Sequence, residues 1–113
     1  MSPVVMADPI SAQECAEHRD RGDAIVVDMR PQVVRHQGSL PGAVVVEPYE
    51  LVAAFAPNSS RRITAIDDLD TEIDVVSVSS QAPQIAQQIA ALGYTNVHYV
   101  DGGFRALRSA ISA

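Results

Sequence analysis

Two serines, Ser79 and Ser80, stand directly after an apolar β-branched stretch and just before a helical pattern, a place where α/β proteins bind ligands. A serine hydroxyl attacks poorly unless a neighbouring base takes its proton. His36 is the one histidine we expect near these serines, because His18 and His98 fall inside a helix and a strand. The glycines of a Gly-x-Ser-x-Gly elbow are also missing. We therefore favour a structural role, in which Ser80 caps the following helix, over acyl or phosphoryl chemistry.

Cys15 is the only cysteine of the chain. A single thiol rules out an intramolecular disulfide and removes the thiolate sets of structural zinc sites. Cys15 occupies a helical position at which an apolar side chain would face a sheet, so we expect a small buried side chain. A redox-active thiol is the alternative, although the carboxylates of Glu14 and Glu17 would raise rather than lower its pKa.

Asp28 and Arg30 end another apolar run, at the edge where a parallel sheet binds its ligands. The guanidinium of Arg30 could bind a sulfur oxyanion or a phosphate through a charged fork. The alternative is an internal ion pair with Asp28 that holds the loop. The acidic segment 67–74 lacks the glycine and the distal glutamate of an EF-hand, which indicates a solvated connector rather than a calcium site. We expect neither a metal nor a cofactor.

Apolar runs and helical patterns alternate along the chain. The unbroken β-branched run 24–27 is typical of a strand covered on both faces of a parallel sheet. Ile85 and Ile89 recur at helical spacing, whereas the dipeptide Asp8-Pro9 predicts a break after the first strand. Strands are predicted at residues 4–6, 24–28, 43–46, 74–78 and 97–100, and helices at residues 11–21, 48–55, 83–93 and 104–111.

The composition limits the partners and the compartment. A chain of 113 residues forms one domain, which we place at residues 1–113. Fourteen acidic residues against eight arginines and no lysine give a net charge of −6, which disfavours nucleic acid and anionic membranes as partners. The sequence shows neither a signal peptide nor an apolar run of about 18 residues, so we expect a cytoplasmic protein without a membrane span.

Two segments resemble the signature of the rhodanese-like domain family. In IVVDMRPQVVRHQGSLPGAVVV, residues 25–46, the aspartate of an Asp-x-Arg motif is followed ten residues later by a Gly-x-x-Pro-Gly-Ala block. In LGYTNVHYVDGGFRAL, residues 92–107, the end of a helix is followed by a strand and by Asp-Gly-Gly-Phe. The resemblance spans residues 3–113. It implies an α/β fold with a five-stranded parallel sheet flanked by helices on both faces.

In this family a catalytic cysteine follows the fourth strand, where successive backbone amides wrap a bound anion and stabilise a persulfide. The resemblance places Ser79 at or beside the position of that cysteine. The loop is also shorter by about three residues, which truncates the amide cradle. Val34 and Ser39 replace an acidic residue and a histidine that are common in the family. A serine offers no route for sulfur transfer, because a thiol is needed to carry sulfur as a persulfide.

We therefore predict a non-catalytic rhodanese-like domain that acts as a binding or regulatory module for an unknown protein partner or a small anion. The predicted ligand-binding residues, at the ends of the second and fourth strands, are Asp28, Arg30, Ser79, Ser80, Gln81 and Ala82. One alternative is a divergent transferase or hydrolase in which a serine or a water acts in the shortened loop. Another is an assembly protein that pairs through an exposed apolar surface and has no pocket.

Overall fold

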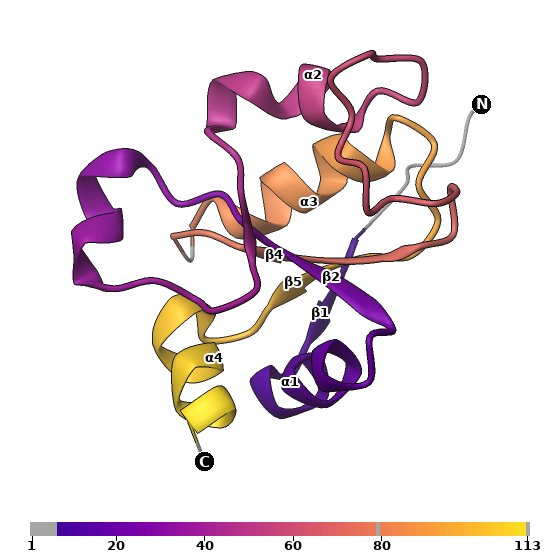
Figure 1. Ribbon diagram of the computed structural model, residues 1–113. Coiled ribbons are helices and arrows are strands. Elements are labelled where there is room, and N and C mark those ends of the chain that lie inside the picture. The colour runs from indigo at the N-terminus through magenta and orange to yellow at the C-terminus, as the bar shows by residue number, and fades with distance from the viewer. Residues whose placement is uncertain (1–6, 79, 113) are drawn as a thin grey trace.

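A five-stranded sheet forms the centre of the molecule (Figure 1). The computed structural model describes residues 7–78 and 80–112. The strands are β1 (Asp8–Ile10), β2 (Ala24–Asp28), β3 (Val44–Val45), β4 (Glu72–Val76) and β5 (Val97–Val100), in the spatial order β1-β5-β4-β2-β3. Every neighbouring pair is parallel. The predicted five-stranded parallel sheet is confirmed.

Helices cover both faces of this sheet, with α1 and α4 on one side and α2 and α3 on the other (Figure 1). The α-helices are α1 (Ala12–Asp20), α2 (Leu51–Phe55), α3 (Ala82–Ala90) and α4 (Gly103–Ser112), and the 3-10 helices are η1 (Gln32–Gln37) and η2 (Pro48–Glu50). Helical crossovers are the usual way to join parallel strands, so the alternating pattern of the sequence gives this architecture. Among the described residues, no helix combines the length and the apolar character that a bilayer crossing requires.

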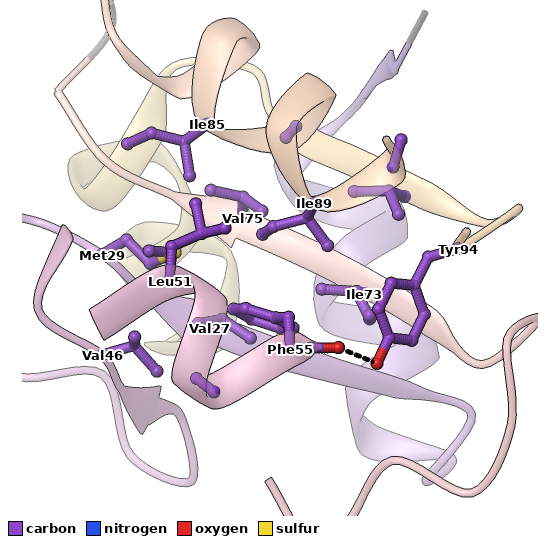
Figure 2. Close-up of a cluster of buried hydrophobic side chains, with 14 of the residues drawn as sticks. Val27, Met29, Val46, Leu51, Phe55, Ile73, Val75, Ile85, Ile89 and Tyr94 are labelled. Carbon is purple, nitrogen blue, oxygen red and sulfur yellow. Dashed lines mark hydrogen bonds between the residues drawn. The ribbon is translucent and has the colours of Figure 1, made fainter. Parts of the chain in front are cut away.

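Each face of the sheet carries its own apolar cluster, because side chains alternate along a strand. Ile73 and Val75 of β4 point towards α2 and α3, where they pack with Phe55 and Ile89 (Figure 2). Within this cluster the hydroxyl of Tyr94 donates to the Phe55 carbonyl. The cluster on the opposite face includes Ile10, Cys15, Val26, Val76, Val100, Phe104 and Leu107.

The first described strand includes residues at which the sequence predicted a break. Asp8–Ile10 forms β1 and pairs with β5, in the register Asp8 to His98 and Ile10 to Val100. The predicted break at Asp8-Pro9 is therefore wrong, and the strand predicted at residues 4–6 lies outside the described residues. Pro9 is tolerated because β1 is an edge strand, where only one side of the backbone needs hydrogen-bond partners.

The strand β4 begins and ends before the predicted limits of residues 74–78. Glu72–Val76 pairs with Ala24–Asp28 over its full length. The limits of β4 are therefore set by its pairing with β2 and not by the length of the apolar run. Glu72 begins the strand opposite Ala24, and its carboxylate lies 2.9 Å from Nδ1 of His18. Ser77 and Val78 consequently leave the strand and belong to the loop before α3.

Candidate functional site

A hollow of about 300 Å³ opens at the carboxyl ends of β2, β4 and β5. Three segments that are distant in sequence meet there, and η1 and the start of α4 lie at the same end of the sheet (Figure 1). The lining residues are Arg30, Val34 and Gln37 after β2, Ser77 and Val78 after β4, and Gly102, Gly103, Phe104 and Arg105 after β5. Open α/β sheets bind their ligands at this edge, so the hollow is the candidate site.

Asp28 fixes the guanidinium of Arg30 beside the hollow. Arg30 Nε donates to Asp28 Oδ1 at 2.9 Å, and Nη2 donates to Oδ2 at 2.7 Å. The Arg30 amide donates to the same Oδ1 at 3.1 Å, and Nη2 also donates to the Gly38 carbonyl at 2.7 Å. Both residues of the pair are 2% exposed, so burial and a bidentate geometry hold the side chain in one orientation. The predicted internal ion pair is confirmed.

One donor group of Arg30 is left over for a ligand. Within the described part of the chain, Nη1 is buried and has no hydrogen-bond partner. A buried donor without an acceptor costs free energy, which an oxygen atom bound in the hollow would recover. The guanidinium carbon also lies 3.8 Å from the centroid of the Phe104 ring, a cation–π contact that fixes the guanidinium against the wall. Arg30 therefore serves the ion pair and lines the hollow at the same time.

Two glycines, Gly102 and Gly103, carry the chain from β5 into α4. Gly102 and Gly103 have φ angles of +80° and +64°, in the left-handed region that favours glycine. A Cβ on Gly102 would lie 2.7 Å from the Cβ of Ala106, and a Cβ on Gly103 would lie 3.4 Å from the Ser77 carbonyl. Asp101 and Gly102 form a turn, and Gly103 is the first residue of α4. Gly103, Phe104 and Arg105, the first residues of α4, line the hollow. Because the first amides of a helix lack intrahelical acceptors, this end of α4 carries partial positive charge.

Ser77 is a lining residue that the sequence interpretation placed inside a strand. Its hydroxyl donates to the Met29 carbonyl at 3.2 Å, and the Met29 amide donates to the Val76 carbonyl at 2.8 Å. These two bonds tie the ends of β2 and β4 together and position the wall. The sequence interpretation also missed the wall that Phe104 and Arg105 provide. The sequence signal for this wall was the Asp-Gly-Gly-Phe string after the last strand. The string follows β5, whose carboxyl end lies at the same edge of the sheet as that of β4.

The other predicted ligand residues are not among those that line the hollow. Ser80 and Gln81 are exposed, and Ala82 is 3% exposed at the start of α3. The amides of Gln81 and Ala82 both donate to the Val78 carbonyl, at 2.8 and 3.0 Å, so they are not available to cradle an anion. Ser79 lies outside the described residues. The predicted Ser80 cap is wrong, because Gln81 occupies the N-cap position of α3 and makes no capping hydrogen bond with the described residues.

Neither a thiol nor an imidazole belongs to the described lining of the hollow. Cys15 has no exposed surface and lies in the core between α1 and the sheet, as predicted, and this burial raises the pKa of its thiol. His36 Nδ1 lies 2.7 Å from the Val33 carbonyl of the same 3-10 helix. His18 and His98 lie in α1 and β5. In the described ranges, no three His, Cys, Asp or Glu side chains are grouped to hold a metal ion.

Comparison with known families decides where this fold belongs. The model of the rhodanese-like domain matches residues 11–110. The chain belongs to the rhodanese-like domain family. In this rhodanese-like domain the loop 77–81 between β4 and α3 reads Ser-Val-Ser-Ser-Gln and contains no cysteine. A search for relatives among curated protein sequences found no match.

Several solved structures share the fold of this rhodanese-like domain. A Rhodopseudomonas palustris protein of unknown function, described as a possible tyrosine phosphatase, superposes with a TM-score of 0.76 at 19% identity, over 92% of this chain and 81% of that chain. The human single-domain sulfurtransferase gives a TM-score of 0.75 at 22% identity, over 91% and 96% of the two chains. A rhodanese-related protein from Thermoplasma volcanium gives 0.65 at 19% identity, over 90% and 91%. At these identities the likeness shows the fold alone.

Proposed function

We propose that this rhodanese-like domain is a non-catalytic module that binds an anionic group in the hollow at the ends of β2, β4 and β5. The observation that carries the proposal is the buried Nη1 of Arg30, which has no hydrogen-bond partner among the described residues, on a side chain that lines the hollow. A guanidinium binds oxyanions through short charge-assisted hydrogen bonds. The amide groups at the start of α4 and the side chain of Arg105 add positive charge at the same place.

The absence of a cysteine from the loop after β4 supports a binding role rather than sulfur transfer. Sulfur transfer needs a thiolate that takes up the sulfur atom and passes it on as a persulfide. Cys15 is the only candidate in the sequence, and burial raises the pKa of its thiol. A hydroxyl cannot replace the thiol in this step, because it is neither ionised near neutral pH nor able to carry the sulfur atom.

The alternative is a divergent transferase or hydrolase that uses a serine or a water molecule. This reaction would need a base within hydrogen-bond reach of the nucleophile. No described histidine lines the hollow, and Nδ1 of His36 is engaged with the Val33 carbonyl. The described geometry therefore supports binding better than serine chemistry.

Three large apolar side chains are exposed on consecutive elements of the chain. Val45, Tyr49 and Val52 are 55%, 85% and 63% exposed, on the consecutive elements β3, η2 and α2. Exposed apolar residues that lie together often mark contacts with other proteins. The hollow contradicts the version of the assembly hypothesis in which the domain has no pocket. We assign the anionic group to the hollow and leave this apolar surface outside the proposal.

The proposal is tested by titrating the ¹⁵N-labelled protein with sodium sulfate at constant ionic strength, with sodium chloride as the reference salt. We expect saturable shifts of the Arg30 side-chain signal and of the amides at the start of α4. Arg105→Gln is expected to weaken the binding, whereas Arg21→Gln is a matched control, because that exposed side chain pairs with Asp23 in the turn after α1. Shifts spread evenly over the surface would contradict the proposal.

A second measurement addresses catalysis. We expect sulfur transfer from thiosulfate to cyanide at the rate of the protein-free reaction, with no difference between the natural chain and the Ser79→Ala variant. Mass spectrometry after incubation with thiosulfate is expected to show the unmodified mass. Transfer well above the Ser79→Ala rate, or a persulfide on Cys15, would overturn the non-catalytic assignment.

A further inference from the structure

A second hollow continues the first along the surface of α4. It has a volume of about 470 Å³ and is lined by Gln37, Phe104, Arg105, Arg108 and Ser109. Gln37, Phe104 and Arg105 line both hollows, so the two form one groove, which we call the α4 groove. At roughly 30 Å³ for each water molecule in the liquid, the first hollow alone has room for on the order of ten waters. The α4 groove is therefore much larger than a single small oxyanion.

The α4 groove carries positive charge that the rest of the chain does not neutralise. Among the described residues, Arg105 and Arg108 form no ion pair, although the exposed Asp101 stands four residues before Arg105. Five other arginines each pair with a carboxylate, namely Arg19, Arg21, Arg30, Arg35 and Arg61, whereas Arg62 forms no ion pair with the described residues either. Arg105 and Arg108 are three residues apart on α4, so two guanidiniums without a carboxylate partner lie within one helical turn, in a chain of net charge −6.

Arg108 is held along the groove without losing its charge. Its Nη1 donates to the Gln37 carbonyl at 3.3 Å, and its guanidinium carbon lies 5.7 Å from the centroid of the Phe104 ring. A side chain at Gly38 would overlap Nη1 of Arg108, so this glycine makes room for the guanidinium beside the loop. Neither contact involves a carboxylate, so the remaining donors of Arg108 can bind an acidic group.

We propose that the α4 groove binds an acidic polypeptide segment of a partner protein. The inference rests on the proposed function, because one carboxylate of the segment occupies the anion position beside Arg30 and the first amides of α4. Later acidic side chains then reach Arg105 and Arg108. Residues three apart on a helix have Cβ atoms about 5–6 Å apart, and alternate residues of an extended strand are roughly 6.6 Å apart. A segment with glutamate or aspartate at alternate positions therefore matches the two guanidiniums.

The overall charge of the domain makes such binding local. A chain of net charge −6 repels an acidic segment over most of its surface, so attraction is confined to the groove where arginine is in excess. Guanidinium forks bind carboxylates in two-point geometry, and Gln37 and Ser109 offer polar groups to the peptide backbone. The partner class is thus an acidic peptide rather than a free small anion.

The test measures fluorescence anisotropy of a labelled peptide in which glutamate alternates with glycine, against the same peptide with glutamine in place of glutamate. We expect the glutamate peptide to bind and the glutamine peptide to bind at least about tenfold more weakly. Arg108→Gln is expected to lower the affinity for the glutamate peptide roughly three- to tenfold, and Arg108→Lys is expected to lower it less. Arg62→Gln is the matched control, because its side chain contacts the Pro57 carbonyl and forms no ion pair with the described residues.

The sulfate titration separates this inference from the proposed function. Arg108 does not line the first hollow, so Arg108→Gln is expected to leave the sulfate response at Arg30 unchanged. The acidic-peptide inference fails, and the proposed function stands, if sulfate binds at Arg30 but the glutamate and glutamine peptides bind with equal affinity. The same conclusion follows if Arg62→Gln weakens binding of the glutamate peptide as much as Arg108→Gln does. If sulfate produces no response at Arg30, the proposed function fails and the inference fails with it.

Discussion

Asp74 is a buried carboxyl in the middle of β4, and we predict that it makes the fold less stable as the pH rises. It has no exposed surface, and within the described residues neither of its oxygens has a hydrogen-bond partner. Burial raises the pKa of Asp74 from its ordinary 3.8 to about 8, and the neighbouring Glu72 carboxyl adds to the rise. Cys15 and Glu14 of α1 also face it, and His98 is its register partner on β5.

The direction of the effect follows from proton binding. The folded protein keeps the Asp74 proton up to about pH 8, whereas the unfolded chain loses it near the ordinary pKa of 3.8. Between these values the folded state binds more protons, so the free energy of unfolding falls as the pH rises, by about 1.4 kcal/mol for each pH unit. Between about pH 5.5 and pH 8 the loss amounts to roughly 3 kcal/mol, part of it shared with Glu72.

The assay is urea unfolding followed by circular dichroism at a series of pH values, with Asp74→Asn compared with the natural chain. The amide cannot ionise, so the variant is expected to lose most of the pH dependence over this range. Asp101→Asn is the matched control, because it removes an exposed carboxyl from the turn before α4 and should leave the pH dependence intact. Parallel curves for Asp74→Asn and the natural chain would refute the reasoning.

Two further predictions concern the two apolar clusters. Cys15 is expected to resist a thiol reagent in the folded protein and to react once urea unfolds the chain. The reason is that burial blocks access to the thiol and raises its pKa. Rapid modification of the native protein would contradict this prediction. Tyr94→Phe is expected to lower the free energy of unfolding by about 1 to 2 kcal/mol, since it leaves the buried Phe55 carbonyl without the hydroxyl donor (Figure 2). Urea unfolding measures the change, and a variant as stable as the natural chain would show that the hydrogen bond contributes nothing net.

The alternation of strands and helices follows from local patterns that the sequence carries in full. The run 24–27 has no polar interruption, and a strand with both faces apolar is stable only between two layers of helices. The helical spacing of Ile85 and Ile89 likewise assigns a buried face to α3. These patterns need no knowledge of the rest of the fold, because the period of the side chains is a property of the backbone geometry itself.

The ends of the strands depend on pairing between distant segments. Pro9 would break a central strand, but it lies at an edge, and the position of β1 at the edge is a property of the complete sheet. Removing the Glu72 carboxylate from water would cost free energy without His18 of α1 beside it. Local propensity therefore predicted β4 but not β1, and pairing with β5 and β2 decided which residues form these two strands.

The sequence by itself determined that no thiol follows the fourth strand and that Asp28 and Arg30 stand at the end of the second. The tertiary structure decided that Arg30 lies against Phe104 and that Arg105 and Arg108 extend the same groove. Residues so far apart in the chain meet because the order β5-β4-β2 brings the carboxyl ends of these strands to one edge. Strand order results from packing of the whole chain, which no local spacing of residue types encodes.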